Sequence, residues 1–504
     1  MAPFGFMLNY LSSRKSDMKE AQLANLRSIM ATNKSTEFGK SHRFNRITRL
    51  EHLKHYVPIH EYEDIYPLIE RMKAGESDIL LKGVIKDYAV SAGTSGAGKH
   101  IPLSKDRIAS DQRFMRMVSL SYLAQRPNIM PFLGTHVSLP GAIDQHEEFP
   151  DVHLGEISGY LAKHSPKWLS IFQVRPPEQM IKESFEYKFE KGLEEALKND
   201  VRQITAIPSW MLKFFQKALE KTGKSTIKDV WPNLKLLICG GESLSTYKPH
   251  FKKLCEGLEL DFIENYGASE GYFAFTDDLD CEDLKLVTDN GIFFEWIPNP
   301  NDVEDLKKAE TIPTWEVETD TQYAMVVTNN SGLYRYVLND VIEFTDIDTP
   351  RIKVLGRMSD MLDQFGEAVE GWEAERALEY AARRHNAEYS VFTLGASLDG
   401  VNDVPKHHWF IQWVTPPTDE MQFIQDVDEK LKEINRHYHN RRNSVALDSP
   451  RFYNLNKDIL QQWKDRFFNL GAQTKTPRMI TDDDKLSGLR ELCSEQQLGV
   501  VQSS

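Results

Sequence analysis

The residues best suited to chemistry lie between positions 90 and 104, where three glycines, three small hydroxyl residues and a lysine occur within nine positions. The hydroxyl residues are Ser91, Thr94 and Ser95, and the lysine is Lys99. Backbone N–H groups of a glycine-rich loop can surround phosphate oxygens, and the lysine adds a positive charge. The composition therefore indicates a phosphate-binding loop, and a glycine turn without a ligand is the alternative.

Two kinds of phosphate-binding loop fit this composition. Residues 93 to 99 satisfy the spacing of a Walker loop, but the next residue is His100, where Ser or Thr should bind magnesium. A Walker loop also opens a helix, whereas Pro102 disfavours a helical Ile101 and interrupts the run. The sequence therefore favours a hydroxyl-rich loop between two extended segments.

Two further motifs follow predicted strands. The turn Gly240-Gly241-Glu242 comes after the apolar stretch 234–239, and the run Tyr266-Gly267-Ala268-Ser269-Glu270 comes after the stretch 260–265. Ligands of α/β sheets gather at the carboxyl ends of strands, so both motifs are candidates for one site. A turn with an incidental acid is the structural alternative for Glu270.

Three more polar residues occur later in the chain. Asp340 follows a Tyr-Arg-Tyr run, Arg357 lies in a Gly-Arg pair, and Lys475 lies in a Lys-Thr-Pro-Arg element. Taken singly, Asp340 could be a helix cap and the Gly-Arg pair a surface turn. The order and spacing of all these motifs are more informative than any one motif.

The elements that must position these residues alternate between helices and strands. Apolar periodicity predicts the helices 17–32, 62–73, 105–125, 178–197 and 209–222, and the strands 134–139, 203–208 and 324–329. The alternation indicates an α/β fold with largely buried strands.

The character of the sequence changes near residue 353. Beyond it, the pattern predicts the helices 372–384 and 421–438 and the strands 391–396 and 409–414. These elements form an α+β unit of their own. We therefore expect a large N-terminal domain over residues 1–355 and a small C-terminal domain over residues 356–504.

The bulk composition describes an ordinary globular protein with 504 residues, 40% of them hydrophobic. A net charge of −14 argues against a broad nucleic-acid or membrane surface, and no stretch is apolar enough to span a membrane. The start of the chain is a poor signal peptide. Four scattered cysteines predict reduced thiols in a cytoplasmic protein, which we expect to be monomeric.

The series of motifs resembles the adenylate-forming superfamily of acyl-CoA synthetases, peptide-synthetase adenylation domains and luciferases. It is more similar to the Gretchen Hagen family of acyl acid amido synthetases, the auxin-responsive plant enzymes with bacterial relatives, and we expect a bacterial-type member. The resemblance covers nearly the whole chain and rests on the segments 36–42, 57–65, 74–76, 269–273 and 475–478. One departure is the spacing from Tyr334 to Asp340, which has two extra residues and Asn339 where the superfamily usually has glycine.

The resemblance implies a large adenylating domain with mixed β-sheets flanked by helices, followed by a small mobile lid domain. The reaction would join a carboxylic acid to ATP, releasing pyrophosphate, and then transfer the acyl group to an amine, usually an amino acid. ATP and Mg²⁺ are the cofactors that it implies.

The resemblance also assigns roles to individual residues. The phosphate loop (Ser91, Thr94, Ser95, Gly96 and Lys99) would hold the triphosphate, Ser269 would reach the α-phosphate, and Glu270 would bind magnesium. Tyr266, with Gly267 and Ala268, would lie against adenine beside Gly240, Gly241 and Glu242. Asp340 would accept hydrogen bonds from the ribose near Arg357, and Lys475 would arrive on the lid.

Candidate walls of the acid pocket are Met115, Val118, Ser119 and Trp210, which fit the hydrophobic core equally well. Two rival functions stay open. One is an acyl-CoA ligase, for which residues 397–404 offer a weak pantetheine-binding face. The other is a catalytically silent nucleotide-binding homologue, against which the retention of Lys99, Glu270, Asp340 and Lys475 argues.

Overall fold

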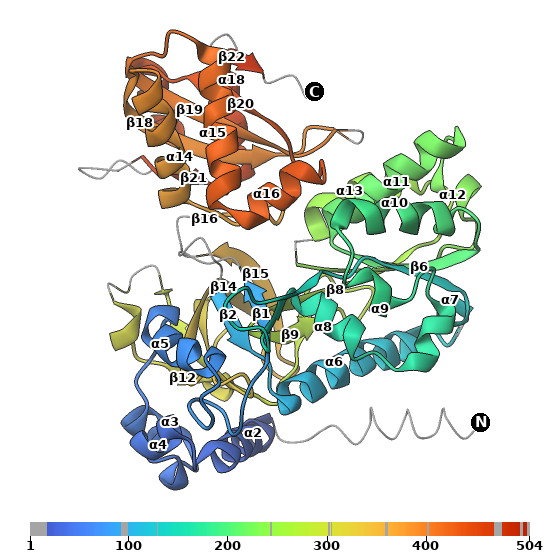
Figure 1. Cartoon of the computed structure of the whole chain (residues 1–504), viewed down its shortest axis with the longest axis vertical. Helices are drawn as coiled ribbons and strands as arrows, with labels where there is room; N and C mark the ends of the chain where they lie inside the picture. The colour runs from blue at the N-terminus through green and yellow to red at the C-terminus, as the bar shows by residue number, and fades with distance from the viewer. Residues whose placement is uncertain are drawn as a thin grey trace. The chain divides into compact units, whose positions relative to one another are not determined.

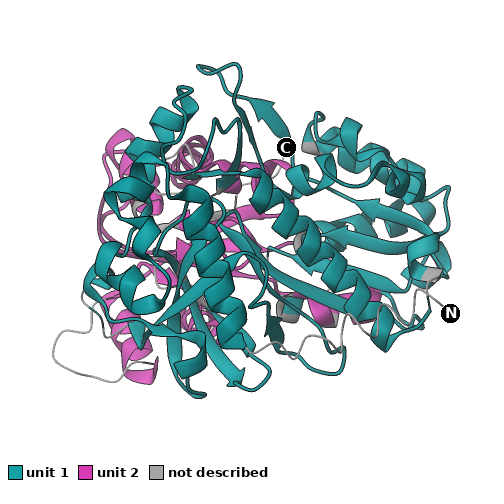
Figure 2. Cartoon of the chain, turned by 90° about the horizontal axis from the view of Figure 1, so that it is seen from below, with its two compact units in different colours: residues 1–91, 99–244, 255–358 teal, residues 92–98, 245–254, 359–504 magenta. Residues whose placement is uncertain are grey.

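A computed structural model of the chain describes residues 18–91, 99–128, 130–241, 244–300, 303, 305–357, 361–400, 403–467, 476–493 and 497–500 (Figure 1). The chain divides into two compact units (Figure 2). The large unit comprises Met1–Ser91, Lys99–Leu244 and Cys255–Met358, and the small unit comprises Ala92–Gly98, Ser245–Leu254 and Ser359–Ser504.

The large unit is built on a sheet of eleven strands among the described residues. Their spatial order is β12 (Ile312–Pro313), β11 (Ile292–Pro298), β13 (Gln322–Asn329), β14 (Tyr336–Asp346), β15 (Arg351–Arg357), β10 (Leu284–Leu286), β9 (Gly271–Phe275), β8 (Asp261–Ala268), β7 (Leu236–Gly240), β6 (Val201–Ala206) and β3 (Thr135–Ser138). Strands β3, β6, β7 and β8 are parallel, whereas the others pair antiparallel. The predicted α/β class with mixed sheets is confirmed.

Helix α6 (Lys105–Gln125) covers part of this sheet and matches its predicted bounds. Ser104 caps it by accepting a hydrogen bond from the Arg107 N–H group at 3.0 Å. Its apolar face, including Phe114 and Val118, packs with Ile263 and other residues of the sheet in one hydrophobic cluster. The helix therefore holds the strands that carry the 266–270 motif.

A second, four-stranded sheet carries the segments beside the glycine loop. Its strands, in spatial order, are β2 (Lys99–Pro102), β1 (Asp87–Ser91), β5 (His153–Gly155) and β4 (Ile143–Gln145). Strands β1 and β2 pair antiparallel, with Ser91 opposite Lys99. The prediction of two extended segments around the loop is confirmed, because Lys99 begins a strand and not the helix of a Walker loop.

Four α-helices of the described residues precede these sheets: α2 (Met18–Asn33), α3 (Glu37–Ser41), α4 (Leu50–Tyr56) and α5 (Tyr62–Lys73). Their apolar side chains, such as Leu26 and Ile69, share a hydrophobic core with residues of β11, β13 and β14. A reciprocal capping box between Glu61 and Asp64 begins α5. The predicted helices 17–32 and 62–73 are confirmed.

The remaining helical segments of the large unit are short or connect the parallel strands. They are η1 (Phe44–Arg46), α7 (Met130–Leu133), α8 (Ile157–Lys163), η2 (Lys167–Phe172), α9 (Pro177–Met180), α10 (Phe185–Ala196), α11 (Pro208–Thr222), α12 (Ile227–Val230), η4 (Leu306–Lys308) and η5 (Thr314–Glu316). Helix α13 (Leu244–Leu254) falls almost wholly in the small unit. The predicted helix 178–197 is two helices, because Ser184 accepts a hydrogen bond from the Tyr187 N–H group and caps a new one.

The small unit has a five-stranded sheet with the order β21 (Met479–Ile480), β18 (Glu388–Ser397), β19 (Lys406–Thr415), β20 (Asp448–Asn454) and β22 (Gln497–Val500). A ribbon of β16 (Met361–Leu362) and β17 (Val369–Glu370) is separate from this sheet. Its helices are α14 (Gly371–Arg384), α15 (Glu420–Ile434), α16 (Arg436–Asn443), α17 (Lys457–Phe467) and α18 (Asp483–Leu492). The predicted α+β unit is confirmed.

The predicted helix 421–438 is wrong as a single element. Asn435 ends α15 and caps α16, since its side chain accepts a hydrogen bond from the Tyr438 N–H group at 2.7 Å. Its amide group also donates to the Glu373 carboxylate at 2.6 Å. A buried asparagine with these partners breaks a helix that apolar periodicity alone would continue.

Within the described residues, no helix combines the length and apolarity needed to cross a bilayer.

Candidate active site

The 266–270 motif forms the end of a β-hairpin. Tyr266, Gly267 and Ala268 belong to β8, and only Ser269 and Glu270 form the turn before β9 begins. The predicted end of the strand at residue 265 is therefore wrong by three residues. Gly267 is required in this hairpin, because a Cβ atom there would come within 2.5 Å of the Tyr272 ring.

Side chains from other elements hold both carbonyl groups of this turn. The Arg107 guanidinium donates from Nη1 to the Ser269 carbonyl at 3.0 Å, and the Asn329 amide donates to the Glu270 carbonyl at 2.7 Å. The same Arg107 nitrogen donates to Ser331 Oγ at 2.9 Å. The backbone of the turn is therefore held on both sides, and this fixes the position of the Glu270 Cα atom.

Arg107 is itself buried in an ion pair. Its Nε atom donates to the Asp111 carboxylate at 2.8 Å and 3.0 Å, and both side chains are almost fully buried. Burial raises the pKa of Asp111, and the charge of Arg107 opposes that shift. Sequence reasoning missed Arg107, although its place in the first turn of the helix that follows the phosphate loop and β2 could have drawn attention to it.

Lys99 and Glu270 meet at a tyrosine that the sequence analysis did not single out. The Lys99 ammonium donates to the Tyr336 hydroxyl at 3.4 Å, and it also lies 5.8 Å from the centre of the Tyr62 ring. Burial, followed by the charge of the Glu270 carboxylate, raises the pKa of Tyr336 far above its ordinary value. The neutral phenol thus lies beside a cation and a carboxylate, two groups that phosphate chemistry uses.

Tyr62 anchors the start of β2 beside this cluster. Its hydroxyl accepts a hydrogen bond from the His100 N–H group at 2.7 Å, and the His100 ring lies 3.0 Å from the Lys73 ammonium. Burial raises the pKa of Tyr62 above its ordinary range, with a smaller contribution from Glu270. Helix α5 therefore fixes the strand that carries Lys99.

Ser269 joins the turn to the strand before the glycine loop. Its hydroxyl donates to the Val90 carbonyl of β1 at 3.2 Å. Ser91, the next residue, is paired across the sheet with Lys99. The predicted residues Ser91, Lys99, Ser269 and Glu270 are therefore brought together within the large unit.

The residues predicted to bind the nucleoside also meet. The Tyr266 hydroxyl donates to Oδ2 of Asp340 at 2.5 Å, and Asp340 is only 8% exposed. Asp340 lies in β14 directly opposite Arg357 in β15. The alternatives of a helix cap for Asp340 and a surface turn for Arg357 are wrong, because both residues belong to paired strands.

The Gly240-Gly241 turn adjoins this region at the carboxyl end of β7. Gly240 is paired with Asn265 of β8, and a Cβ atom on Gly240 would lie 3.1 Å from the Asn265 carbonyl. Gly241 has a φ of +83°, a conformation that favours glycine. The ends of β7 and β8 therefore lie side by side, as the sheet rule predicted.

Arg335 of the Tyr-Arg-Tyr run turns away from the site. Its guanidinium pairs with the buried Glu295 carboxylate at 3.1 Å and donates to the Val57 carbonyl at 2.9 Å. Its φ of +47° is the left-handed conformation, which directs neighbouring side chains differently from a regular strand. Arg335 is therefore a core residue of the large unit.

The candidate pocket walls lie on α6 and α11. Val118 is 2% exposed within the hydrophobic cluster of α6, against which Met115 packs, and the Ser119 hydroxyl donates to the Met115 carbonyl at 3.1 Å. Trp210 is 6% exposed. Their role as pocket walls stays a prediction.

Several other predicted site residues lie outside the described residues: Thr94, Ser95, Gly96, Glu242 and Lys475.

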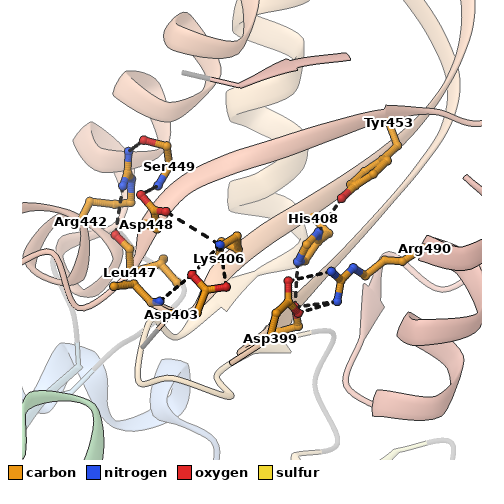
Figure 3. A network of polar contacts seen from close by, with 12 residues as sticks. Asp399, Asp403, Lys406, His408, Arg442, Leu447, Asp448, Ser449, Tyr453 and Arg490 are labelled. Carbon is orange, nitrogen blue, oxygen red and sulfur yellow. Dashed lines mark hydrogen bonds and ion pairs between the residues drawn. The ribbon is translucent and has the colours of Figure 1, made fainter. Parts of the chain in front are cut away.

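The described residues of segment 397–404, the weak pantetheine candidate, are 397–400 and 403–404, and several of them belong to a polar network of the small unit (Figure 3). The Ser397 hydroxyl lies 2.9 Å from Nε2 of His408, and Arg490 pairs with Asp399 at 2.7 Å. At the other end of the segment, Lys406 pairs with Asp403 at 2.8 Å. Burial, then the charge of Arg490, lowers the pKa of His408 to about 3. A histidine with so low a pKa is a poor general base.

Glu270 is the carboxylate of this cluster that could bind magnesium. No group of three or more His, Cys, Asp or Glu side chains among the described residues is placed to hold a metal ion. Magnesium is usually held by one or two carboxylates together with substrate phosphates and water. A single buried carboxylate beside Lys99 and Tyr336 fits that mode of binding, in which the nucleotide completes the site.

Three family models match the chain in order. They are the GH3 family N-terminal domain over residues 7–190, the GH3 family central domain over residues 285–357 and the GH3 family C-terminal domain over residues 372–484. Together they cover most of the chain.

Individual relatives and a solved structure resemble the chain along most of its length. The indole-3-acetic acid-amido synthetase GH3.2 of Arabidopsis thaliana is 21% identical over 452 residues, covering 76% of this chain and 82% of the relative. The 4-substituted benzoates-glutamate ligase GH3.12 of the same plant is 24% identical over 428 residues, covering 70% and 71%. The structure of the AtGH3.15 acyl acid amido synthetase with 2,4-DB has a TM-score of 0.62 at 16% identity, covering 99% and 97% of the two chains.

Proposed function

The chain belongs to the GH3 family, and from this membership we propose that it is an ATP-dependent acyl acid amido synthetase. It adenylates a small-molecule carboxylic acid, releasing pyrophosphate, and transfers the acyl group to an amine. The acceptor that we propose is an amino acid, because one relative is named a benzoates-glutamate ligase.

The observation that carries this proposal is the convergence of Lys99 and Glu270 on the buried hydroxyl group of Tyr336. Adenylation builds negative charge at the α-phosphate and on the departing pyrophosphate, so it needs fixed cations and donors. In the proposed mechanism the Lys99 ammonium neutralises the triphosphate, and the Ser269 hydroxyl orients the α-phosphate. Magnesium, which Glu270 would bind together with the phosphates, supplies further positive charge.

The nucleoside is proposed to lie along the carboxyl ends of β7 and β8 and beside Asp340 in the interior of β14. The Asp340 carboxylate accepts hydrogen bonds from the ribose hydroxyl groups, and the Tyr266 ring lies against adenine. The hydrogen bond from Tyr266 to Asp340 supports this assignment, because it orients both side chains before the nucleotide binds. The glycines at 240 and 241 leave room for the base.

Residues 356–504 are proposed to form the lid domain that delivers Lys475 to the reacting phosphate. The lid would act by rotation about a hinge between residues 356 and 364. Limited proteolysis tests this proposal, because a hinge is cleaved preferentially in the free enzyme. We expect the first cuts between residues 350 and 366 and protection by ATP with the acid; first cuts within residues 180–230, unchanged by ligands, would refute the hinge.

The function is tested by ATP–pyrophosphate exchange on the wild type and Glu270→Gln. A neutral amide cannot replace a magnesium-binding carboxylate, so Glu270→Gln is expected to lose nearly all exchange activity while remaining folded. Glu256→Gln is the matched control, because Glu256 is exposed on the same unit. Exchange by Glu270→Gln at the wild-type rate, with limiting magnesium, would remove Glu270 from the site.

The second step is tested by product mass. The wild type is incubated with ATP, a panel of carboxylic acids and either amino acids or coenzyme A, and the products are identified by mass spectrometry. An acyl–amino acid amide is the expected product. A thioester without an amide would make the protein an acyl-CoA ligase, and the absence of any acyl-adenylate would make it a silent homologue.

A further inference from the structure

A cavity of about 550 Å³ lies in the N-terminal part of the large unit. Its walls come from residues 37–42, from residues 58–68 and from Lys307. Phe38, Ile59 and His60 are buried and form its floor. These are the segments 36–42 and 57–65 on which much of the family resemblance rests, yet the adenylation chemistry assigns them no role. Their residues therefore line a site that the proposed reaction leaves unexplained.

Two histidine rings face this cavity in fixed orientations. Nδ1 of His60 lies 2.9 Å from the Tyr334 carbonyl, and Nδ1 of His42 lies 3.0 Å from the Phe38 carbonyl. A carbonyl oxygen can only accept, so each Nδ1 carries the proton and each Nε2 is left as an acceptor when the ring is neutral. Among the described residues neither Nε2 atom has a hydrogen-bond partner, and the ring centres are 6.2 Å apart.

The floor of the cavity is rigid and partly aromatic. The His42 ring stacks on the Phe38 ring with 3.9 Å between the ring centres, and the Phe38 ring stacks on the Tyr334 ring with 5.1 Å between the centres. The His60 backbone is hydrogen-bonded on both sides, to the Arg335 carbonyl at 2.9 Å and to the Val337 N–H group at 3.0 Å. His60 is 92% buried, so its unpartnered acceptor is a preorganised polar group on an otherwise apolar floor.

Charge at the rim selects among possible ligands. Burial lowers the pKa of His60, which keeps this ring neutral near pH 7. Lys307, the one lysine or arginine among the described residues that line the cavity, is already paired with Asp64 at 2.9 Å and lies 3.8 Å from Glu61. An anion would therefore compete with these carboxylates. A metal is disfavoured too, because no group of three suitable ligands is placed for one among the described residues.

We propose that this cavity is a second small-molecule site, which binds a primary ammonium group carried on a small apolar body. The ammonium donates hydrogen bonds to Nε2 of His60 and His42, and the apolar body packs against Phe38, Ile59 and Leu68. Asp64 at the rim adds a favourable charge. An apolar primary amine without a carboxylate has this chemistry. The inference is independent of the proposed reaction, since it uses none of the adenylation residues.

The test is calorimetric titration of the full chain without ATP or acid, using phenethylammonium chloride as the probe. Saturable binding at millimolar concentration is expected. The neutral isostere 2-phenylethanol should bind at least about tenfold more weakly, because it lacks the charge-assisted hydrogen bonds. Equal binding of the two probes, or no saturable binding of either, would overturn the proposal.

Two variants locate the probe. His60→Asn keeps a donor for the Tyr334 carbonyl but removes Nε2, so binding should weaken about tenfold or more. Ser41→Trp, at an exposed position of the rim, should block the cavity even if His60→Asn fails to fold. His55→Asn, exposed on α4 outside the cavity, is the matched control and should bind as the wild type does. Unchanged binding by Ser41→Trp would place the probe elsewhere and refute the site.

Discussion

The ammonium nitrogen of Lys99 lies 3.4 Å from the hydroxyl oxygen of Tyr336. Tyr336 is 1% exposed, and after burial the Glu270 carboxylate is the main cause of its raised pKa. The tyrosine therefore joins the first residue of β2 to the turn after β8, two elements that are far apart in the sequence. In this arrangement a neutral hydroxyl keeps the cation and the carboxylate apart and oriented.

Tyr336→Phe is expected to slow adenylation by about tenfold, because Lys99 loses a hydrogen-bond partner and can turn toward Glu270. The fold should persist, since the ring still fills the core. ATP–pyrophosphate exchange at several magnesium concentrations measures the effect. Tyr66→Phe, 44% exposed on α5, is the control. A Tyr336→Phe rate equal to that of the control would show that the hydroxyl has no part in catalysis.

Arg107→Lys tests whether Arg107 positions the turn at Ser269 and Glu270 or only stabilises the fold. Lysine keeps a positive charge near Asp111 but cannot reach Asp111, Ser269 and Ser331 together, so kcat should fall by about tenfold or more. Arg107→Ala leaves the buried Asp111 carboxylate without its partner and should lower the free energy of unfolding by about 3–5 kcal/mol.

The double variant Arg107→Met/Asp111→Leu provides the contrast. Replacing both charges with apolar groups should restore most of the stability, because a buried ion pair contributes little net free energy. Activity should stay low, since no side chain then holds the Ser269 carbonyl. Urea unfolding and pyrophosphate exchange measure the two effects. Recovery of full activity along with stability would reduce Arg107 to a structural residue.

His408 is expected to make the stability of the small unit depend on pH. Its pKa is about 3 in the folded protein against 6.5 for an ordinary histidine, so the unfolded chain takes up the proton first as the pH falls. Between those values the free energy of unfolding should decrease by about 1.4 kcal/mol per pH unit through this group. Above pH 6.5 the ring is neutral in both states and the effect vanishes.

His408→Gln should flatten that dependence. Urea titrations of the full chain between about pH 4 and pH 7 measure the slope. His439→Gln, at an exposed position of α16, should keep the wild-type slope. An identical slope for His408→Gln and the wild type would mean that the ring is already protonated in the folded state or exposed to water.

Lys475→Ala separates binding from chemistry. If the lysine contacts the reacting phosphate only in the closed arrangement, adenylation should slow by about 100-fold or more while the affinity for ATP hardly changes. Chromatography of the nucleotide products should show AMP and pyrophosphate with the wild type. ADP as the main product, or an unimpaired variant, would contradict the adenylating mechanism.

The local elements around the site were predictable because single residues decide them. Pro102 excludes a helix after the glycine loop, and the helical spacing of apolar residues gives α5 and α6 their correct bounds. Periodicity could not give the length of the 266–270 hairpin, since β8 continues through Gly267 only because the strand β9 pairs with it. Such strand pairing depends on contacts between two segments, so the pattern of either segment alone cannot predict it.

The site residues likewise fall into those that the sequence could predict and those that it could not. Ser269 and Glu270 are prominent in the sequence because they follow a buried strand, and Lys99 and Asp340 because they lie in short motifs, the glycine loop and the run after Tyr-Arg-Tyr. Tyr336 and Arg107 are not, because a tyrosine in a strand and an arginine in a helix are ordinary. Arg335 shows the opposite error, since its motif suggests chemistry while its side chain pairs with the buried Glu295. Its left-handed backbone, directly before β14 begins at Tyr336, turns its side chain away from the site.

The dependence of the N-terminal helices on distant strands has a consequence for biosynthesis. Gln22 donates to the Ile292 carbonyl at 3.0 Å, and the His60 N–H group donates to the Arg335 carbonyl at 2.9 Å. The first helices therefore lack a large part of the core that they pack against until strands β11 to β14 have left the ribosome, on the order of tens of seconds after they emerge themselves. During that interval part of their apolar surface is exposed, so the nascent chain is a natural client for chaperones that shield hydrophobic surface.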